Sequence, residues 1–170
     1  MKSHYEIEEL SYLIFALGKE QFAANVSKII EVIRDAGLTE VPKTEDYIEG
    51  VINFRGEIIT VVNTKKKIRL TDNKKIEKPV IIVFELEFDG KKVRLGAITD
   101  KVKRVVELHE DEIHAVPDFG SYYNPEFLEG AINTSQGFIM ILDVEKIFSA
   151  KDVEIIRKTE EKQKHKSSKS

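Results

Sequence analysis

The sequence predicts a mainly β protein built from two similar small subdomains packed into one body. The main observation is a repeat, because residues 47–53 and 127–133 follow the same order of aromatic, aliphatic, Glu, Gly, small apolar, Ile and Asn. Each copy is followed at the same offset by an apolar run that ends at Asn63 or Asp143. A long-period repeat indicates one supersecondary unit used more than once. Short apolar runs at regular spacing, separated by turn residues, favour small barrels over an α/β sheet.

The N-terminal part of the chain is expected to form a β-hairpin. Residues 12–17 and 21–26 are apolar runs, and Gly18 lies between them at the position of a turn. Residues 27–33 are compatible with a short helical turn that continues as a strand, because periodicity cannot separate the two states at this length.

A second hairpin is expected in the first copy of the repeat. The segment 46–49 resembles one helical turn closed by Gly50, because Gly accepts the left-handed cap of a helix. Residues 51–54 and 57–62 then provide two strands joined at Arg55 and Gly56.

The second half is predicted to begin after a polar, Lys-rich crossover at residues 63–78. Residues 80–86 are the most hydrophobic strand candidate in the chain. Asp89-Gly90 is a strong hairpin signal, and residues 93–99 supply the returning strand. Valines between residues 102 and 106 extend the β pattern.

The C-terminal part changes its pattern after Asp143. Apolar residues occur there among charged ones, which predicts a helix with an apolar stripe: Val144, Ile147, Phe148, Val153, Ile155 and Ile156. From Lys158 onward no apolar anchor remains, so this end is expected to be disordered or frayed.

These elements predict an N-terminal arm at residues 1–10, one domain at residues 11–155, and a charged, disordered tail at residues 156–170. The domain is expected to divide into subdomains at about residues 11–78 and 79–150, with a possible exchange of terminal strands between them.

The composition excludes several classes of protein. The chain of 170 residues has no cysteine, which rules out a disulfide framework, a zinc–thiolate site and a thiol nucleophile. Charged residues make up 34% of the chain but the net charge is only −3, so the sequence gives no broad basic field for nucleic acid. The N-terminus lacks the apolar core of a signal peptide and no apolar run approaches the length of a membrane span, so a cytoplasmic location is expected.

Candidate catalytic and metal sites are weak. His109 and His114 flank three carboxylates, but the zincin motif needs two His four residues apart on one helix face, and these are five apart. A solvated charged turn is therefore the favoured interpretation. Asp100, Asp143 and Asn63 end apolar strands, where such residues usually serve as turn or cap residues.

The one basic cluster and one isolated arginine are the remaining candidates. The cluster comprises Lys65, Lys66, Lys67, Arg69, Lys74 and Lys75, with no interleaved aromatic residue, so a solvated crossover is favoured over a nucleic-acid groove. Arg55 lies at the tip of an otherwise apolar hairpin. It is either a free surface charge or a partner for a carboxylate, and Glu31 is the candidate because it lies at the end of an apolar run.

The chain resembles the chemotaxis coupling protein family, CheW. Residues 50–63, Gly-Val-Ile-Asn-Phe-Arg-Gly-Glu-Ile-Ile-Thr-Val-Val-Asn, are similar to that family's Gly-Val-Ile-Asn-Leu-Arg-Gly-x-Ile-x-Pro-Val-x-Asp. Residues 95–102 resemble its Gly-x-x-Val-Asp-x-Val segment, and the similarity extends over residues 10–150.

The resemblance implies two five-stranded, SH3-like β-barrels around a shared apolar core. It also implies a non-enzymatic adaptor, without a cofactor, that connects chemoreceptors to the regulatory domain of the histidine kinase CheA. Such a protein would be cytoplasmic and recruited to membrane-associated receptor arrays, without inserting into the membrane or binding nucleic acid.

The resemblance also implies which residues meet these partners. By motif position, Ile29, Glu31, Arg55 and Val80 correspond to residues that form or support the groove for the receptor's cytoplasmic tip. Phe119, after Pro117 and Asp118, matches an aromatic loop position at the family's contact with the kinase.

Three other functions stay open at this point. The family's Pro-Val-x-Asp-Leu-Arg becomes Thr60-Val61-Val62-Asn63-Thr64-Lys65, which is compatible with an adaptor for a different array or for a kinase pathway outside chemotaxis. A nucleic-acid-binding double barrel would use Lys65–Lys67, and a divalent-metal hydrolase would use His109 and His114.

Overall fold

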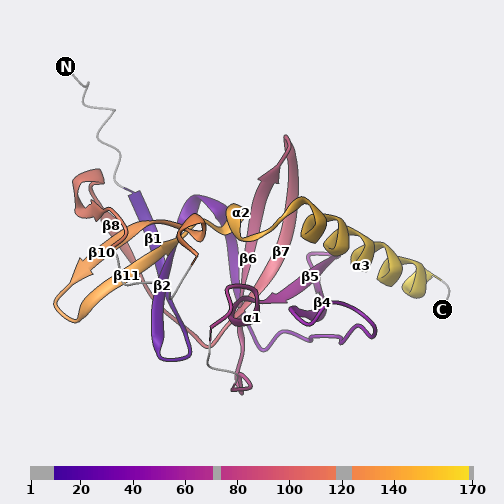
Figure 1. Ribbon diagram of the computed structural model, residues 1–170. Coiled ribbons are helices and arrows are strands. Elements are labelled where there is room, and N and C mark those ends of the chain that lie inside the picture. The colour runs from indigo at the N-terminus through magenta and orange to yellow at the C-terminus, as the bar shows by residue number, and fades with distance from the viewer. Residues whose placement is uncertain (1–9, 71–73, 118–123, 169–170) are drawn as a thin grey trace.

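The computed structural model describes residues 10–70, 74–117 and 124–168. Within these residues the protein is mainly β, with eleven strands in two sheets and a long C-terminal helix (Figure 1). This confirms the predicted fold class. None of the helices in the described part of the chain is long and apolar enough to cross a membrane.

The six-stranded sheet has the order β8-β1-β2-β11-β10-β9. Its strands are β1 (Leu10–Leu17), β2 (Glu20–Asn25), β8 (Lys101–Leu108), β9 (Ile113–His114), β10 (Leu128–Thr134) and β11 (Gly137–Leu142). The five-stranded sheet has the order β3-β6-β7-β5-β4. Its strands are β3 (Ile29–Arg34), β4 (Ile48–Phe54), β5 (Glu57–Asn63), β6 (Val80–Phe88) and β7 (Lys91–Thr99).

Short helices join these strands, and one long helix follows them. The helices are η1 (Val26–Lys28), α1 (Thr64–Lys67), η2 (Glu110–Glu112), η3 (Pro125–Phe127), α2 (Val144–Ile147) and α3 (Ala150–Ser168). The short turn η1 leads directly into β3, as the pattern of residues 27–33 allowed.

The two copies of the sequence repeat exchange hairpins. The β1–β2 hairpin of the first copy pairs with β8 and β11 of the second, and the β6–β7 hairpin of the second pairs with β3 and β5 of the first. Both sheets therefore have the same order of equivalent strands. In each, one parallel contact, β11–β2 or β5–β7, joins a hairpin to the other copy.

This exchange crosses the expected division near residues 78 and 79, for which an exchange of terminal strands was allowed. That boundary separates β5 from β6, yet both belong to the five-stranded sheet. Residues 11–78 and 79–150 are thus two sequence repeats but not two sheets. Side-chain periodicity fixes which face of a strand is buried, but it does not specify the strand's partner, and for this reason the sequence could not place the boundary.

Alternating side chains in β1 and β6 build three apolar clusters. In β1, Tyr12 and Ile14 face the interior of the six-stranded sheet, whereas Leu13 and Phe15 face the cluster between the sheets. In β6, alternate residues divide in the same way between the interior of the five-stranded sheet and the cluster between the sheets. This follows from the two-residue period of a strand. The predicted shared apolar core is therefore present, and it is the largest of the three clusters.

Gly50 lies within β4 and does not close a helical turn, contrary to the sequence-based expectation. A Cβ atom at this position would lie 2.1 Å from the carbonyl oxygen of Thr39. Thr39 forms an antiparallel β-bridge with Val51, the residue of β4 that follows Gly50. Gly130, the equivalent residue in the second repeat, faces the carbonyl of His114 in the same manner, at 2.9 Å. The repeated Gly therefore permits a close approach of two backbone segments. In sequence, a Gly with this role cannot be distinguished from a Gly that caps a helix.

Helix α3 begins at a capping box and packs against the shared core. The amide of Ser149 donates to Asp152 Oδ2 at 2.9 Å, and the amide of Asp152 donates to Ser149 Oγ at 3.1 Å. Val153 and Ile156 are buried in the cluster between the sheets. The helix continues to Ser168, so residues 156–168, which were predicted to be disordered, are helical. Tertiary anchoring of the first turns offsets the cost of nucleation, and Lys, Glu and Gln then propagate a helix well.

A buried polar group holds the start of α3. Asp152 Oδ1 accepts a hydrogen bond from the hydroxyl of Tyr47 at 2.8 Å, and Asp152 Oδ2 lies 2.6 Å from Lys67 Nζ. The ammonium of Lys67 also lies 4.5 Å from the centre of the Tyr47 ring. Burial raises the pKa of Asp152, but the hydrogen bonds from Lys67, Ser149 and Tyr47 outweigh it and hold this pKa below its usual value.

A second polar contact holds the middle of α3 against β5. The amide of Thr60 donates to Glu160 Oε1 at 3.1 Å, and the hydroxyl of Thr60 donates to the carbonyl of Ile156 at 3.2 Å. Burial raises the pKa of Glu160 to about 7, although the hydrogen bonds from Thr60 favour its charged form. The nearby carboxylate of Glu57 also contributes to this raised pKa.

Replacing Gly50 by Ala should lower the free energy of unfolding by about 3 kcal/mol or more, because the new methyl group overlaps the carbonyl of Thr39. Gly37→Ala is the matched control, since nothing lies within 4 Å of its Cβ position, and its effect should stay within about 0.5 kcal/mol. Urea denaturation followed by circular dichroism measures both. Equal stability of the Gly50→Ala variant and the wild type would show that the close approach is wrong.

The contribution of Glu160 to stability should decrease with rising pH. Its pKa is near 4.5 when unfolded and about 7 when folded, so the folded state is penalised increasingly between these values and fully above them. Glu160→Gln keeps an oxygen for the Thr60 amide without this penalty, so its melting temperature relative to the wild type should rise from pH 5 to pH 8. The exposed Glu161→Gln is the control. A pH-independent difference for Glu160→Gln would contradict this account.

Candidate interaction site

The structure brings Glu31 and Arg55 together at the rim of the five-stranded sheet. Glu31 projects from β3, an end strand of this sheet, and Arg55 occupies the turn between β4 and β5. Arg55 Nη2 donates to Glu31 Oε1 at 3.0 Å. The predicted partnership between these two residues is therefore confirmed, and the alternative of a free surface charge is not observed.

Local contacts fix the conformation of the Arg55 turn. Arg55 has a φ of 52°, in the left-handed region that residues other than Gly adopt uncommonly. Asn53 Oδ1 accepts a hydrogen bond from the amide of Gly56 at 3.0 Å, which closes the turn. The guanidinium carbon of Arg55 lies 4.8 Å from the centre of the Phe54 ring. The arginine is thus held in place by its turn, its neighbouring ring and Glu31.

The Glu31–Arg55 pair is exposed, which limits its contribution to folding. The side chains of Arg55 and Glu31 are 59% and 43% exposed. An ion pair of this exposure stabilises a protein by about 0–1 kcal/mol. The pair nevertheless presents a directional donor and acceptor at the surface, which suits recognition of a partner better than stabilisation of the core.

Ile29 and Val80 lie in the neighbouring strands β3 and β6 but at opposite ends of the pair. Ile29 is opposite Phe84, whereas Val80 is opposite Arg34, so about 13 Å of strand separates them at ~3.3 Å per residue. Ile29 is half-buried against the shared core, and Val80 is buried. The four predicted residues therefore lie on adjoining strands and one turn, and a hydrogen bond joins Glu31 to Arg55.

Phe119, the predicted kinase contact, lies outside the described residues. The other sequence candidates have structural partners. Asn63 and Asp143 accept hydrogen bonds from backbone amides and cap α1 and α2, as expected for strand-end residues. Asp100 Oδ2 accepts from the amide of Gly18 at 2.6 Å.

The two candidate histidines lie apart from any cluster suited to a metal ion. The amide of His109 donates to Glu112 Oε1 at 3.0 Å at the start of η2. His114 lies in β9 and pairs with Ala131 of β10. In the part of the chain that the structure describes, no group of three or more His, Cys, Asp or Glu side chains is placed to hold a metal ion.

Each of the three lysines of α1 lies close to a carboxylate. Lys65 Nζ lies 3.1 Å from Asp100 Oδ2, with its side chain only 4% exposed. Lys66 Nζ lies 3.8 Å from Glu49 Oε1, and Lys67 is bound to Asp152 as described above. These pairings offset the charges of the three α1 lysines. Lys74 and Lys75, the next lysines of the cluster, line a hollow with Lys19, Lys65 and Lys78 and with the carboxylates of Glu77 and Asp100.

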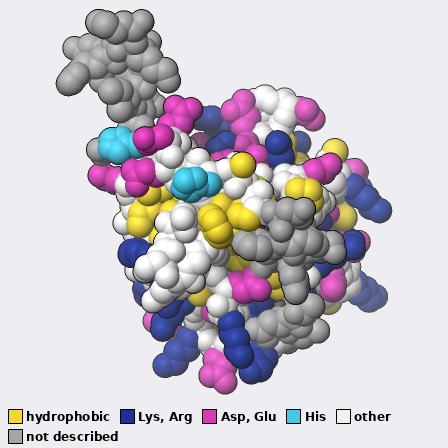
Figure 2. All heavy atoms as spheres, turned by 60° about the vertical axis from the view of Figure 1, so that its left-hand side comes forward, with side chains coloured by type: hydrophobic (Ala, Val, Ile, Leu, Met, Phe, Trp, Pro, Cys, Tyr) yellow, Lys and Arg dark blue, Asp and Glu magenta, His cyan; other side chains and the backbone are white. Residues whose placement is uncertain are grey.

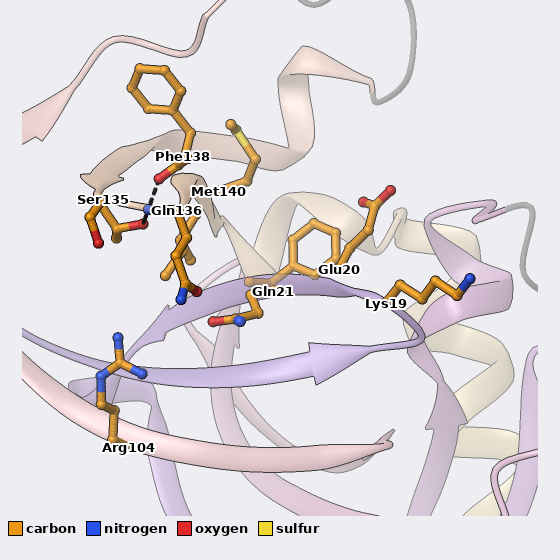
Figure 3. Close-up of a pocket in the computed structure, with 12 residues that line it drawn as sticks. Lys19, Glu20, Gln21, Arg104, Ser135, Gln136, Phe138 and Met140 are labelled. Atoms are coloured by element: carbon orange, nitrogen blue, oxygen red, sulfur yellow. Dashed lines mark hydrogen bonds between the residues drawn. The ribbon is translucent and has the colours of Figure 1, made fainter.

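Sequence reasoning missed a groove of about 660 Å³ on the six-stranded sheet. It lies between the beginnings of β2 and β11, and we call it the β2–β11 groove. Its lining includes Lys19, Gln21, Arg104, Gln136, Phe138 and Met140. In Figure 3, Gln21, Gln136 and Arg104 point toward one another across it, whereas Phe138 points to the outer side of β11. Its residues come from three separate segments, so no local motif announces it.

Comparison with known proteins gives a consistent family relationship. The model of the CheW-like domain matches residues 11–152. Proteins named chemotaxis protein CheW are similar over most of their length. That of Klebsiella aerogenes is 28% identical over 145 residues, which cover 85% of each chain. That of Thermotoga maritima is 29% identical over 141 residues, which cover 83% of this chain and 89% of that one.

A solved structure shows the same architecture. The scaffolding protein TtCheW from Thermoanaerobacter tengcongensis superimposes with a TM-score of 0.72 at 29% sequence identity. The match covers 85% of this chain and 96% of that one. The two-sheet body with its shared core is thus common to both proteins.

Proposed function

Because this chain belongs to the CheW-like domain family, whose model matches residues 11–152, we propose that it is a non-enzymatic adaptor that couples chemoreceptors to the histidine kinase CheA. The observation that carries the proposal is the Glu31–Arg55 pair, held at an exposed rim by contacts that contribute little to folding. The scaffolding name of the structural relative from Thermoanaerobacter tengcongensis supports it.

The proposed receptor site comprises Glu31, Arg55, Ile29 and Val80. A receptor tip is helical, and an amphipathic helix binds by laying apolar side chains on an apolar surface while rim charges set its register. The half-buried Ile29 supplies apolar surface, and the buried Val80 lies at the other end of the β3–β6 pair. The Glu31–Arg55 pair then supplies the directional polar contact.

The second proposed surface binds the regulatory domain of CheA and includes Phe119. Two separate surfaces on one rigid body would fix the geometry between receptor and kinase. In this mechanism the protein transmits a signal by position, without a chemical step. It would be recruited to cytoplasmic receptor arrays through these contacts and not through a membrane segment.

An adaptor for a kinase pathway outside chemotaxis is the second candidate. The observation that favours it is Thr60, which stands where the family pattern has Pro and whose amide donates to Glu160 of α3. Proline has no amide hydrogen and could not make this bond. The contact gives this chain a helix attachment that the family pattern does not provide, which suits a specialised role. Binding to a chemotaxis kinase regulatory domain distinguishes the two candidates.

Replacing Arg55 by Ala should weaken binding to a receptor cytoplasmic-tip fragment by about tenfold or more, since a charge-assisted hydrogen bond is worth about 1.5–3 kcal/mol and each 1.4 kcal/mol is tenfold in affinity. Binding to the CheA regulatory domain should not change, and the free energy of unfolding should change by less than about 1 kcal/mol. Isothermal titration of the full chain against each fragment measures both affinities.

Lys103→Ala is the matched control for the charge change, because Lys103 is exposed on the six-stranded sheet. It should leave both affinities unchanged. Equal receptor affinity in the Arg55→Ala variant and the wild type would refute the proposed receptor site.

A further inference from the structure

The strand registers make Arg104 of β8 the structural equivalent of Glu31 of β3. The sequence repeat fixes the starting point, because it aligns Val61 of β5 with Ile141 of β11. From there the pairings run across each sheet to its end strand. The successive pairs are Val61 with Gly96, Gly96 with Val83 and Val83 with Glu31 in the five-stranded sheet, and Ile141 with Ala23, Ala23 with Ile14 and Ile14 with Arg104 in the six-stranded sheet. In both end strands a register shift lies beside this position, which supports the equivalence.

The six-stranded sheet therefore has a counterpart of the Glu31–Arg55 pair with different side chains. The repeat aligns Arg55 with Ser135, which lies in the turn between β10 and β11. An arginine thus occupies the strand position that holds a carboxylate in the other sheet, and a serine occupies the turn position. Arg104 is exposed, and among the residues that the structure describes no carboxylate lies within ion-pair distance of its guanidinium. The carboxylate that Arg55 finds within its own sheet has no equivalent beside Arg104.

Arg104 points into the β2–β11 groove, where two other polar side chains face it. In Figure 3, Gln21 of β2 and Gln136 of the β10–β11 turn point toward Arg104 across the hollow. A carboxamide carries two N–H donors, so the groove offers one guanidinium and two amides to the same ligand. This set suits a carboxylate, because a guanidinium can bind both carboxylate oxygens and the amides can donate to their remaining lone pairs.

The charges around the groove favour an acidic ligand. Lys19 and Arg104 line it together with one carboxylate, that of Glu20, and Figure 3 shows Glu20 on the side of the hollow away from Arg104. Lys and Arg side chains gather in the lower part of the face shown in Figure 2, which brings the six-stranded sheet forward. A partner of opposite charge would associate faster and in a fixed orientation. The other exposed charged residues of β8 are Lys101, Lys103 and Glu107.

We propose that the β2–β11 groove binds a Glu or Asp side chain on an exposed loop of another protein. The partner's carboxylate lies against Arg104, as Glu31 lies against Arg55 in the five-stranded sheet. Gln21 and Gln136 donate to the same carboxylate from the other side of the groove. The site lies on the six-stranded sheet, so it is separate from the receptor site proposed above.

Nuclear magnetic resonance of the full-length, ¹⁵N-labelled protein tests this site. The probe is the peptide acetyl-Ala-Ala-Glu-Ala-Ala-amide, whose blocked ends leave the carboxylate as its only charge. During titration, the Nε–H signal of Arg104 and the side-chain amide signals of Gln21 and Gln136 should shift and saturate together. The same peptide with Gln in place of its Glu should bind about tenfold more weakly or less, because it offers no charge to the guanidinium.

Four variants separate this site from general attraction. Arg104→Gln should weaken probe binding by about tenfold or more, whereas Lys103→Gln, which removes a neighbouring charge outside the groove lining, should leave it nearly unchanged. Gln136→Glu places a carboxylate of the chain opposite Arg104, so it should shift the Arg104 Nε–H signal without peptide and weaken probe binding several-fold. Arg55→Ala should bind the probe as the wild type does. Because Arg104 and Gln136 are exposed, their variants should keep the wild-type melting temperature.

Any of four outcomes would overturn the proposal. Equal affinity for the Glu and Gln peptides would show that the groove does not recognise a carboxylate. Equal probe affinity in Arg104→Gln and the wild type would place the carboxylate elsewhere on the protein. Acetate that binds as tightly as the peptide would assign the groove to a small free anion. A dimer of the protein alone that dissociates in the Arg104→Gln variant would assign it to a second copy of the chain.

Discussion

The exchange of hairpins between the two repeats is the constraint on which the rest of the structure depends. Each sheet is completed by strands of the other repeat, so neither sheet can form from one half of the sequence. The exchanged hairpins also carry Phe15 and Phe84, which face each other's sheets across the shared core. An apolar cluster of this size cannot be divided without exposing both sheets, so burial makes the two sheets one rigid body. An adaptor that works by geometry requires such a body.

The helix α3 adds an asymmetric feature to this symmetric plan. Its position depends on Asp152, which accepts a hydrogen bond from Tyr47 and forms an ion pair with Lys67. It also depends on Thr60, whose amide donates to Glu160, a bond that proline at this position could not make. These contacts seat α3 on β5 of the five-stranded sheet.

Much of the fold was predictable from the sequence because its signals are local. The turns at Gly18, Arg55-Gly56 and Asp89-Gly90 and the repeat lie where the pattern indicated. The C-terminal helical pattern is present as two helices, α2 and α3, that are separated at Phe148 and Ser149. The pairing of Arg55 with Glu31 was one of two alternatives that the sequence left open, and the hydrogen bond between them decides for it. Long-range features were not predictable: the partner of each hairpin, the carbonyl of Thr39 against Gly50, and the anchoring that extends α3 all depend on residues far apart in the chain.

Native-state hydrogen exchange tests the central claim, that both sheets share one indivisible core, most directly. The slowest amides of β1, β2 and β11 and those of β5, β6 and β7 should exchange only through global unfolding, with the same opening free energy and the same dependence on denaturant. A lower opening free energy for the protected amides of one entire sheet would contradict the account, because it would show that this sheet unfolds while the other remains folded.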